Sequence, residues 1–336
     1  MSARLIARTP KFTLLESAAA AYAGAMVSQE QYLAGAAAQT RAVTTLSVAV
    51  AGLLLGLKAW VWISSGSVAL LASAADSGLD LVAALTTFFA VRYAAAPPDA
   101  EHRFGHGKAE AFASLVQAGL VFASCALIAQ EAVVHLLRPQ TVGPQGWALA
   151  VMLVSVVLTG GLIAAQSRVL RQVASVAVSA DRTHYLADLA SNLVALAGIA
   201  AAAWLGLGQL DALAGLALAA LLLWGAVAVL RQAADQLLDH ELPQDSRARI
   251  ATMILQDPQI TNVHQLRTRA AGPVIYIQAH ADLDPSLSLE AAHHLLDAAE
   301  DRVRLAFPHA DIMIHADPRG MAEAHEEIPE SRAKTR

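Results

Sequence analysis

The sequence is short of charged residues. Only 15% of its 336 residues are Asp, Glu, Lys or Arg, whereas 56% are hydrophobic and the mean hydropathy is +0.47. A water-soluble protein of this length needs a larger charged surface, so the composition indicates a membrane protein. The formal net charge of -5 provides no basic surface for nucleic-acid binding.

Cysteine is almost absent as well. Cys125 is the single cysteine, so no intrachain disulfide can form, and its apolar surroundings predict a small packing residue. The sequence also lacks a His-Glu-x-x-His segment, the helical arrangement that many zinc hydrolases use. These absences argue against a disulfide-stabilised protein and against a common class of metalloenzyme.

Long hydrophobic runs are abundant. Six of them are long enough to cross a bilayer, and they cover residues 43–63, 68–91, 109–137, 146–165, 173–207 and 211–230. We therefore expect a six-helix transmembrane domain over residues 41–238. Residues 1–40 are Ala-rich and are expected to form a mobile extension, in which Met26 is an alternative start to Met1.

Lys and Arg are distributed unevenly among the predicted loops. Most lie before the first span, in the second and fourth loops, or after the sixth span: Arg41, Arg92, Arg103, Lys108, Arg168, Arg171, Arg182, Arg231, Arg247 and Arg249. On the other side only Arg138 occurs. Because cytoplasmic loops carry the excess of positive charge, both termini are predicted to be cytoplasmic.

The chain becomes polar from residue 239 onward, and eight of the twelve histidines lie there. Periodicity predicts helices at 244–256 and 287–307 and strands at 260–269, 274–282 and 310–315. This αββαβ order indicates a small soluble α/β domain over residues 239–318. The charged segment 319–336 is predicted to be a disordered tail.

Two of the apolar spans contain acidic residues and a histidine at helical spacing. Asp76 and Asp80 lie in the second span, and His184 and Asp188 lie in the fifth, each pair at i and i+4 on one helix face. An ionisable residue at membrane depth costs roughly 2.5–3.5 kcal/mol. Polar contacts between helices are the simpler explanation for one such residue, but four at matched spacing predict a divalent-metal site. Protons should compete with metal for these groups, as in an exchanger.

Two further groups contain possible metal ligands. The polar loop after the second span contains Asp99, His102 and His106, and the soluble domain contains His264, His280, His293, His294, His315 and Asp317. Side chains two apart on a strand share a face, so His315 and Asp317 can bind one ion. Spacing alone leaves the alternative of solvated surface histidines open for both groups.

Five ordered motifs resemble the cation diffusion facilitator family, and most closely its bacterial zinc and ferrous-iron efflux branch. They are Asp76-Ser-x-x-Asp80, Phe104-Gly-His-Gly-Lys-Ala-Glu110, Ala180-Asp-x-x-His-Tyr-x-x-Asp188, Leu238-Asp-x-x-Leu-Pro243 and Ile314-His-x-Asp-Pro318. The resemblance extends from about Arg41 to Pro318.

The resemblance implies six transmembrane helices, a cytoplasmic metallochaperone-like domain and a homodimer in a bacterial inner membrane. It implies a transport site of Asp76, Asp80, His184 and Asp188, and a loop site of Asp99, His102 and His106. The implied cytoplasmic site is binuclear, near the dimer interface, and consists of His264, His280, His293, His315 and Asp317. Lys108 and Asp239 match a charged pair that joins the membrane and soluble domains.

We therefore expect a proton-coupled efflux transporter for divalent cations, not an enzyme. Zinc is the leading substrate because imidazole among carboxylates suits it, and Cd²⁺, Fe²⁺ and Co²⁺ are the alternatives. The expected partners are metal ions, protons, lipid and a second copy of the chain. A membrane metal sensor that does not transport, or an intramembrane metalloenzyme, are the alternative functions.

Overall fold

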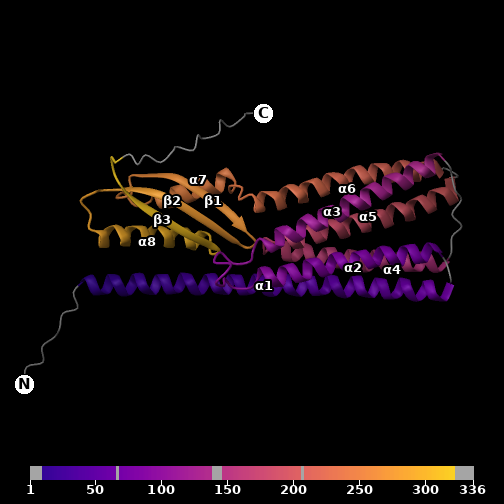
Figure 1. Cartoon of the computed structure of the whole chain (residues 1–336), viewed down its shortest axis with the longest axis horizontal. Helices are drawn as coiled ribbons and strands as arrows, with labels where there is room; N and C mark the ends of the chain where they lie inside the picture. The colour runs from indigo at the N-terminus through magenta and orange to yellow at the C-terminus, as the bar shows by residue number, and fades with distance from the viewer. Residues whose placement is uncertain (1–9, 66–67, 138–145, 206–207, 322–336) are drawn as a thin grey trace, which may run out of the picture. The chain divides into compact units, whose positions relative to one another are not determined.

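The computed structural model describes residues 10–65, 68–137, 146–205 and 208–321 (Figure 1). Residues Ala36–Leu238 form one compact unit, the membrane unit, which contains the long helices except the part of the first helix before Ala36. The second unit contains the chain up to Gly35 and the α/β domain, which begins at Asp239. Residues 1–9 of the expected extension and residues 322–336 of the expected tail lie outside the described residues.

The long helices follow the predicted apolar spans. They are α1 (Pro10–Ser65), α2 (Val68–Ala94), α3 (Ala109–Leu137), α4 (Gly146–Leu170), α5 (Val176–Leu205) and α6 (Gly208–Leu237). Among the described residues, five of these helices contain a stretch long and apolar enough to cross a membrane. The other is α5, whose first half carries Asp181, Arg182 and Asp188 and is therefore less apolar.

The first helix differs from the prediction at its N-terminal end. The expected span covers residues 43–63, but α1 begins at Pro10, and its apolar stretch extends over Gln31–Ser64. Alanine is the strongest helix former, and Pro10 suits the first position of a helix because its missing N–H has no intrahelical partner there. From Pro10 onward the Ala-rich segment is therefore helical.

Helix α5 is central to the membrane unit. It packs against α2, α3, α4 and α6, and its Tyr185 lies in a buried cluster with Val50 of α1. Small side chains such as Ala177 and Ala180 are fully buried on α5 and allow neighbouring helices to approach closely. Cys125 of α3 is buried in an apolar cluster, as predicted.

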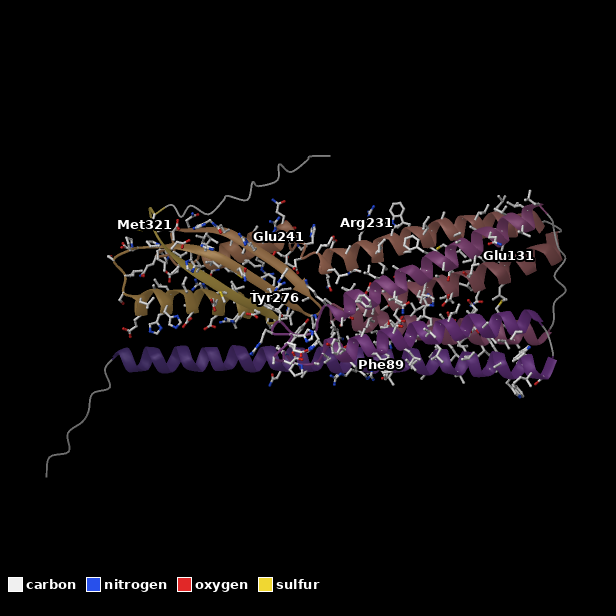
Figure 2. All side chains as sticks on the ribbon, in the orientation of Figure 1. Phe89, Glu131, Arg231, Glu241, Tyr276 and Met321 are labelled. Carbon is white, nitrogen blue, oxygen red and sulfur yellow. The ribbon has the colours of Figure 1, made fainter. Side chains whose placement is uncertain are left out.

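Large apolar side chains are exposed on the outside of the helices. Figure 2 labels Phe89 on α2, which is 63% exposed, and Leu53 and Trp224 are exposed as well. Such a surface would be costly in water, whereas lipid solvates it. Together with the apolar lengths, it fits a multi-pass membrane protein.

The second unit contains a three-stranded sheet. Its elements are α7 (Gln244–Ile254), β1 (Asn262–Ala271), β2 (Val274–Leu283), α8 (Leu289–Ala306) and β3 (Ala310–Pro318). Strands β1 and β2 form an antiparallel hairpin, with Gly272 in the left-handed region at its turn (φ 60°), and β3 pairs parallel to β2 through the α8 crossover. The observed order is the predicted αββαβ.

The helices α7 and α8 pack against one face of this sheet. The core contains Ile277 and Ala279 of β2, Ile314 of β3, and Ala299 and Val303 of α8. The alternate residues of β2, which include His280 and Asp282, must therefore lie on the opposite face. This alternation determines where the histidines of the domain can meet.

Candidate metal sites

Three of the four predicted membrane ligands lie together between α2 and α5. His184 Nε2 is 3.1 Å from Asp80 Oδ1 and 3.7 Å from Asp188 Oδ2. The His184 side chain is only 5% exposed, and one ligand atom from each residue lies within 4.8 Å of the other two. A tetrahedral zinc ion with bonds of about 2.1 Å would separate its ligands by roughly 3.4 Å, so the cluster has the right dimensions.

The fourth predicted ligand, Asp76, is not part of this cluster. It lies one turn before Asp80 on α2, and its side chain is exposed. Beside it, Lys58 of α1 donates a hydrogen bond to Ser77 Oγ (2.7 Å), so a cation from α1 lies close to the acidic pair.

A buried carboxylate near the cluster was not among the predicted site residues. Asp181 of α5 has no exposed surface, and it accepts hydrogen bonds from Ser47 (2.8 Å), Gln166 (2.8 Å) and Gln117 (3.2 Å). These three donors come from α1, α4 and α3. Asp181 is part of the sequence motif that begins at Ala180, but no spacing in the sequence relates Asp181 to its three hydrogen-bond donors.

The loop between α2 and α3 brings its three predicted ligands together. Asp99 Oδ1 is 3.4 Å from His102 Nδ1, and Asp99 Oδ2 is 3.3 Å from His106 Nε2. The loop turns at Gly105, whose φ of 76° lies in the left-handed region that favours glycine. A metal ion could bind between the two imidazoles and the carboxylate.

Hydrogen bonds to the backbone hold the candidate ligands Asp99 and His106 of this loop in place. The backbone N–H of His102 donates to Asp99 Oδ1, and this bond is the main reason that the pKa of Asp99 is lowered. His106 is buried, and its Nδ1 lies 3.4 Å from the Ala96 carbonyl oxygen. With the Nδ1–H donated to that carbonyl, Nε2 would be free for a metal.

In the α/β domain the strand register aligns three histidines in one row. His264 of β1 pairs with His280 of β2, which in turn pairs with His315 of β3. Asp282 and Asp317 form the next row on the same face. A β-bulge follows His264, where Gln265 has a φ of 48°, and bulges commonly redirect a neighbouring side chain.

The Asp317 carboxylate contacts all three of these histidines. Its Oδ2 is 2.8 Å from His280 Nδ1 and 3.3 Å from His264 Nε2, and its Oδ1 is 3.3 Å from His315 Nε2. The side chain is 3% exposed, and among the described residues its Oδ1 accepts no hydrogen bond. A buried carboxylate oxygen without a donor, surrounded by imidazoles, fits a divalent metal ion.

Two residues modify the predicted ligand set of this domain. Asp282 was not predicted, yet its Oδ1 is 3.2 Å from His264 Nε2. His293 was predicted, but it lies on α8, is 69% exposed and pairs with Asp297 at 3.4 Å. Because α8 covers the other sheet face, His293 is not part of this cluster within the described chain.

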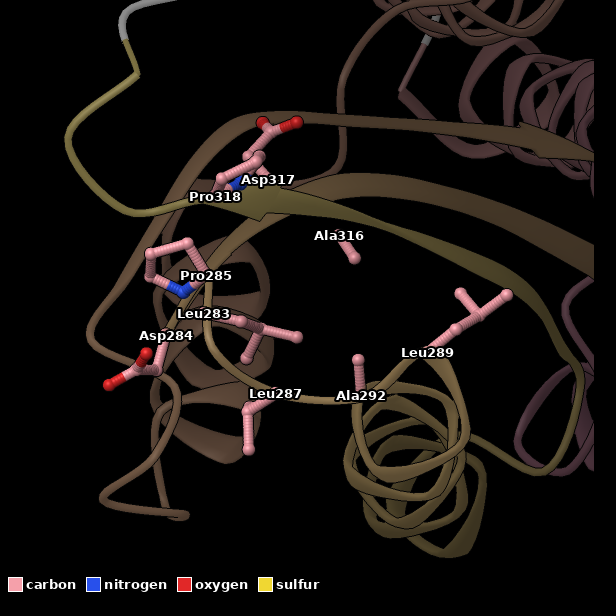
Figure 3. A pocket seen from close by; sticks show the side chains of 9 residues that line it. All are labelled: Leu283, Asp284, Pro285, Leu287, Leu289, Ala292, Ala316, Asp317 and Pro318. Atoms are coloured by element: carbon pink, nitrogen blue, oxygen red, sulfur yellow. The ribbon is translucent and has the colours of Figure 1, made fainter.

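A small apolar pocket lies beside Asp317 (Figure 3). It has a volume of about 230 Å³ and is lined mainly by Leu283, Leu287, Leu289 and Ala292. In Figure 3 the Asp317 carboxylate points away from Leu283 and Ala292. The Asp317 carboxylate oxygens therefore face the other side of the sheet from this pocket.

The predicted charged pair of Lys108 and Asp239 stays a prediction, because the two residues belong to different units. Within its own unit, Asp239 forms an ion pair with Arg269 at 3.3 Å. Within the membrane unit, Lys108 donates to the Leu237 carbonyl oxygen at 3.5 Å.

Comparison with known proteins identifies the family. The family model described as "Cation efflux transmembrane domain" matches residues 44–238, and "Cation efflux protein, cytoplasmic domain" matches residues 242–319. The chain is 39% identical over 272 residues to the cation-efflux pump FieF of Serratia proteamaculans, which covers 81% of this chain and 90% of that protein. It is 36% identical over 278 residues to FieF of Klebsiella pneumoniae, and this alignment covers 83% of this chain and 92% of that protein.

A comparison of structures finds the zinc form of CzrB. It is 31% identical, with a TM-score of 0.24, and covers 25% of this chain and 98% of that one. The two family domains together cover residues 44–238 and 242–319, from the C-terminal part of α1 to β3, in the order that the sequence motifs predict. The chain therefore belongs to the cation diffusion facilitator family, and it is a multi-pass cation-efflux transporter rather than an enzyme.

Proposed function

We propose that this protein exports a divalent metal ion, zinc in the first place, in exchange for protons. The observation that carries the proposal is the cluster of Asp80, His184 and Asp188 between two helices of the membrane unit. Ionisable side chains at this depth are costly unless they serve a substrate. Relatives named cation-efflux pumps support export as the direction.

The choice of zinc follows from the ligand types. One imidazole nitrogen and carboxylate oxygens suit zinc, whereas a purely carboxylate site favours harder ions such as Mn²⁺. Asp76, one turn from Asp80, is the proposed fourth ligand and would join when the substrate binds. Cadmium, ferrous iron and cobalt are the other substrates that this ligand set accommodates.

Proton coupling follows from the charges of the empty site. Neighbouring carboxylates disfavour each other's ionised form, so an empty site would take up protons. A bound divalent ion favours the ionised form and would displace them. Rocking of the helices would expose the site alternately to the two sides of the membrane, and each cycle would exchange metal for protons.

The orientation and assembly are part of the same proposal. The excess of Lys and Arg in alternate loops supports an orientation in a bacterial inner membrane with both termini and the α/β domain on the cytoplasmic side. The family model that matches residues 242–319 carries the name ZT_dimer, which supports a homodimer. Metal bound at the loop and at His264, His280, His315 and Asp317 would tighten that dimer and bias the membrane unit.

Zinc flux across sealed proteoliposomes tests the proposed function. Wild-type protein is expected to move zinc down an imposed zinc gradient at a rate that exceeds that of empty liposomes. If zinc, cadmium, iron and cobalt all fail to move, the transport proposal is wrong and a membrane metal sensor becomes the better explanation.

The cytoplasmic site gives a separate prediction. Asp317→Asn is expected to reduce the number of zinc ions that each protomer binds, because Asp317 contacts all three aligned histidines and supplies their shared carboxylate. The measurement is equilibrium dialysis of the purified protein in detergent. Asp311→Asn, on the same strand but exposed, is the matched control and should bind as the wild type does. Equal zinc binding by the two variants would contradict the proposed site.

A further inference from the structure

The amide of Gln117 connects two helices that carry transport-site residues. Its Nε2 on α3 shares its two N–H donors among Asp181 Oδ1 of α5 (3.2 Å), the Ala83 carbonyl oxygen of α2 (2.9 Å) and Thr87 Oγ1 of α2 (3.0 Å). A carbonyl and a carboxylate are both acceptors, so the amide must turn its NH₂ group toward them. Gln117 and Asp181 are fully buried, and no water competes with these bonds.

The position of this connection matters for the metal. Ala83 lies three residues after Asp80 on α2, and Asp181 lies three residues before His184 on α5. Three residues correspond to about 4.5 Å along a helix. Gln117 therefore bridges α2 and α5 less than one turn from the point where Asp80 and His184 approach each other.

The second ring nitrogen of His184, Nδ1, has no polar anchor among the described residues that would orient the ring independently of its helix. A metal-binding histidine usually donates its second ring N–H to a carboxylate or carbonyl, which orients the ring. The Nδ1 atom of His184 is buried and has no hydrogen-bond partner among the described residues. The positions of α2 and α5 must therefore determine the distance between Asp80 and His184.

We propose that Gln117 is a positioning residue that fixes the spacing of α2 and α5 and so sets the size of metal ion that the site selects. The inference rests on the proposed transport site. With the bridge intact, the ligand spacing suits zinc. Without it, α2 and α5 can separate, and the site accommodates the larger cadmium ion better.

Gln166 provides a matched control in the same network. It donates to the same Asp181 carboxylate at 2.8 Å, is equally buried, and has the same side chain. However, it comes from α4 and bonds to Ser47 of α1 rather than to α2. Substituting Gln166 removes a comparable hydrogen bond and leaves the α2–α5 bridge in place.

The test is competitive uptake of cadmium and zinc by proteoliposomes containing Gln117→Met or Gln166→Met. Methionine keeps the length of the side chain and removes its polar group. Gln117→Met is expected to raise the ratio of cadmium uptake to zinc uptake about tenfold. Residues that orient metal ligands without touching the metal change metal affinity by a similar factor. Gln166→Met should keep the wild-type ratio, even though both variants lose thermal stability. A ratio unchanged in both variants, or raised equally in both, overturns the proposal.

Two further variants make the outcome unambiguous. Thr87→Val removes one α2 partner of Gln117 and is expected to shift the ratio in the same direction by less, so it decides the question if Gln117→Met does not fold. Asp80→Ala is measured in parallel. If Asp80→Ala transports metal, the proposed site itself fails. If Asp80→Ala is inactive while Gln117→Met and Thr87→Val keep the wild-type ratio, only the positioning role fails.

Discussion

Asp80→Ala is expected to abolish zinc transport while leaving the protein folded. Asp80 supplies the oxygen nearest to His184, at 3.1 Å, and it links α2 to α5 at the proposed site. Truncation would leave His184 and Asp188 on α5 with Asp76 as the one remaining proposed ligand on α2, so the tetrahedral set of four protein ligands would be incomplete. The folded state should survive, since alanine removes an ionisable group whose presence in a membrane is itself unfavourable. Zinc flux into proteoliposomes is the measurement.

Leu79→Ala is the matched control for this variant. Leu79 is the preceding residue on α2 and is 58% exposed, so it faces away from the cluster. It should transport like the wild type, and gel filtration should show the same oligomer for all three proteins. An Asp80→Ala protein that exports zinc at the wild-type rate would contradict the proposed transport site.

His184→Asp is expected to change the order of metal preference. The substitution replaces the one nitrogen ligand of the site by an oxygen ligand, and carboxylate sites suit manganese better than zinc. His184 lies within 3.7 Å of both Asp80 and Asp188, and it is the one histidine of this cluster among the described residues. We expect the ratio of zinc to manganese transport to fall about tenfold, a change of about 1.4 kcal/mol in relative affinity. Competitive uptake from an equimolar mixture measures this ratio.

A histidine outside the proposed sites controls for the added negative charge. His240 is exposed, and His240→Asp should retain the wild-type preference. An unchanged preference in His184→Asp would show that the imidazole does not contact the transported ion.

The spans and the α/β order could be predicted because hydropathy and periodicity are local properties of the sequence. The third predicted span, for example, has the bounds of α3, Ala109–Leu137. The start of α1 was missed because the Ala-rich segment was interpreted as a mobile extension, without weighing the helix propensity of alanine.

The composition of the candidate sites was harder to predict. Spacing of i and i+4 places Asp76 and Asp80 on one face, but the step also moves along the helix by about 6 Å, so the structure brings only Asp80 to His184. Asp282 joins its row through the pairing of β2 with β3, and His293 lies on a helix that covers the other sheet face. Such contacts depend on the pairing register of the strands and on which sheet face a helix covers, and the sequence motifs specify neither.

The polar network around Asp181 shows the same limit in the membrane unit. Gln117 and Gln166 are single polar residues on separate helices, and no spacing within either helix relates them to Asp181. Their interaction depends on how α3, α4 and α5 are rotated about their axes, and only the packed structure determines that rotation.

The simultaneous recording of zinc and protons tests the central claim most directly. The same proteoliposomes, loaded with a zinc dye and a pH dye, would receive a zinc gradient, and wild type would be compared with Asp76→Ala. Our proposal predicts zinc movement with proton movement in the opposite direction, and the loss of both signals in the variant. Zinc movement without a proton signal in the wild type would contradict the exchange mechanism.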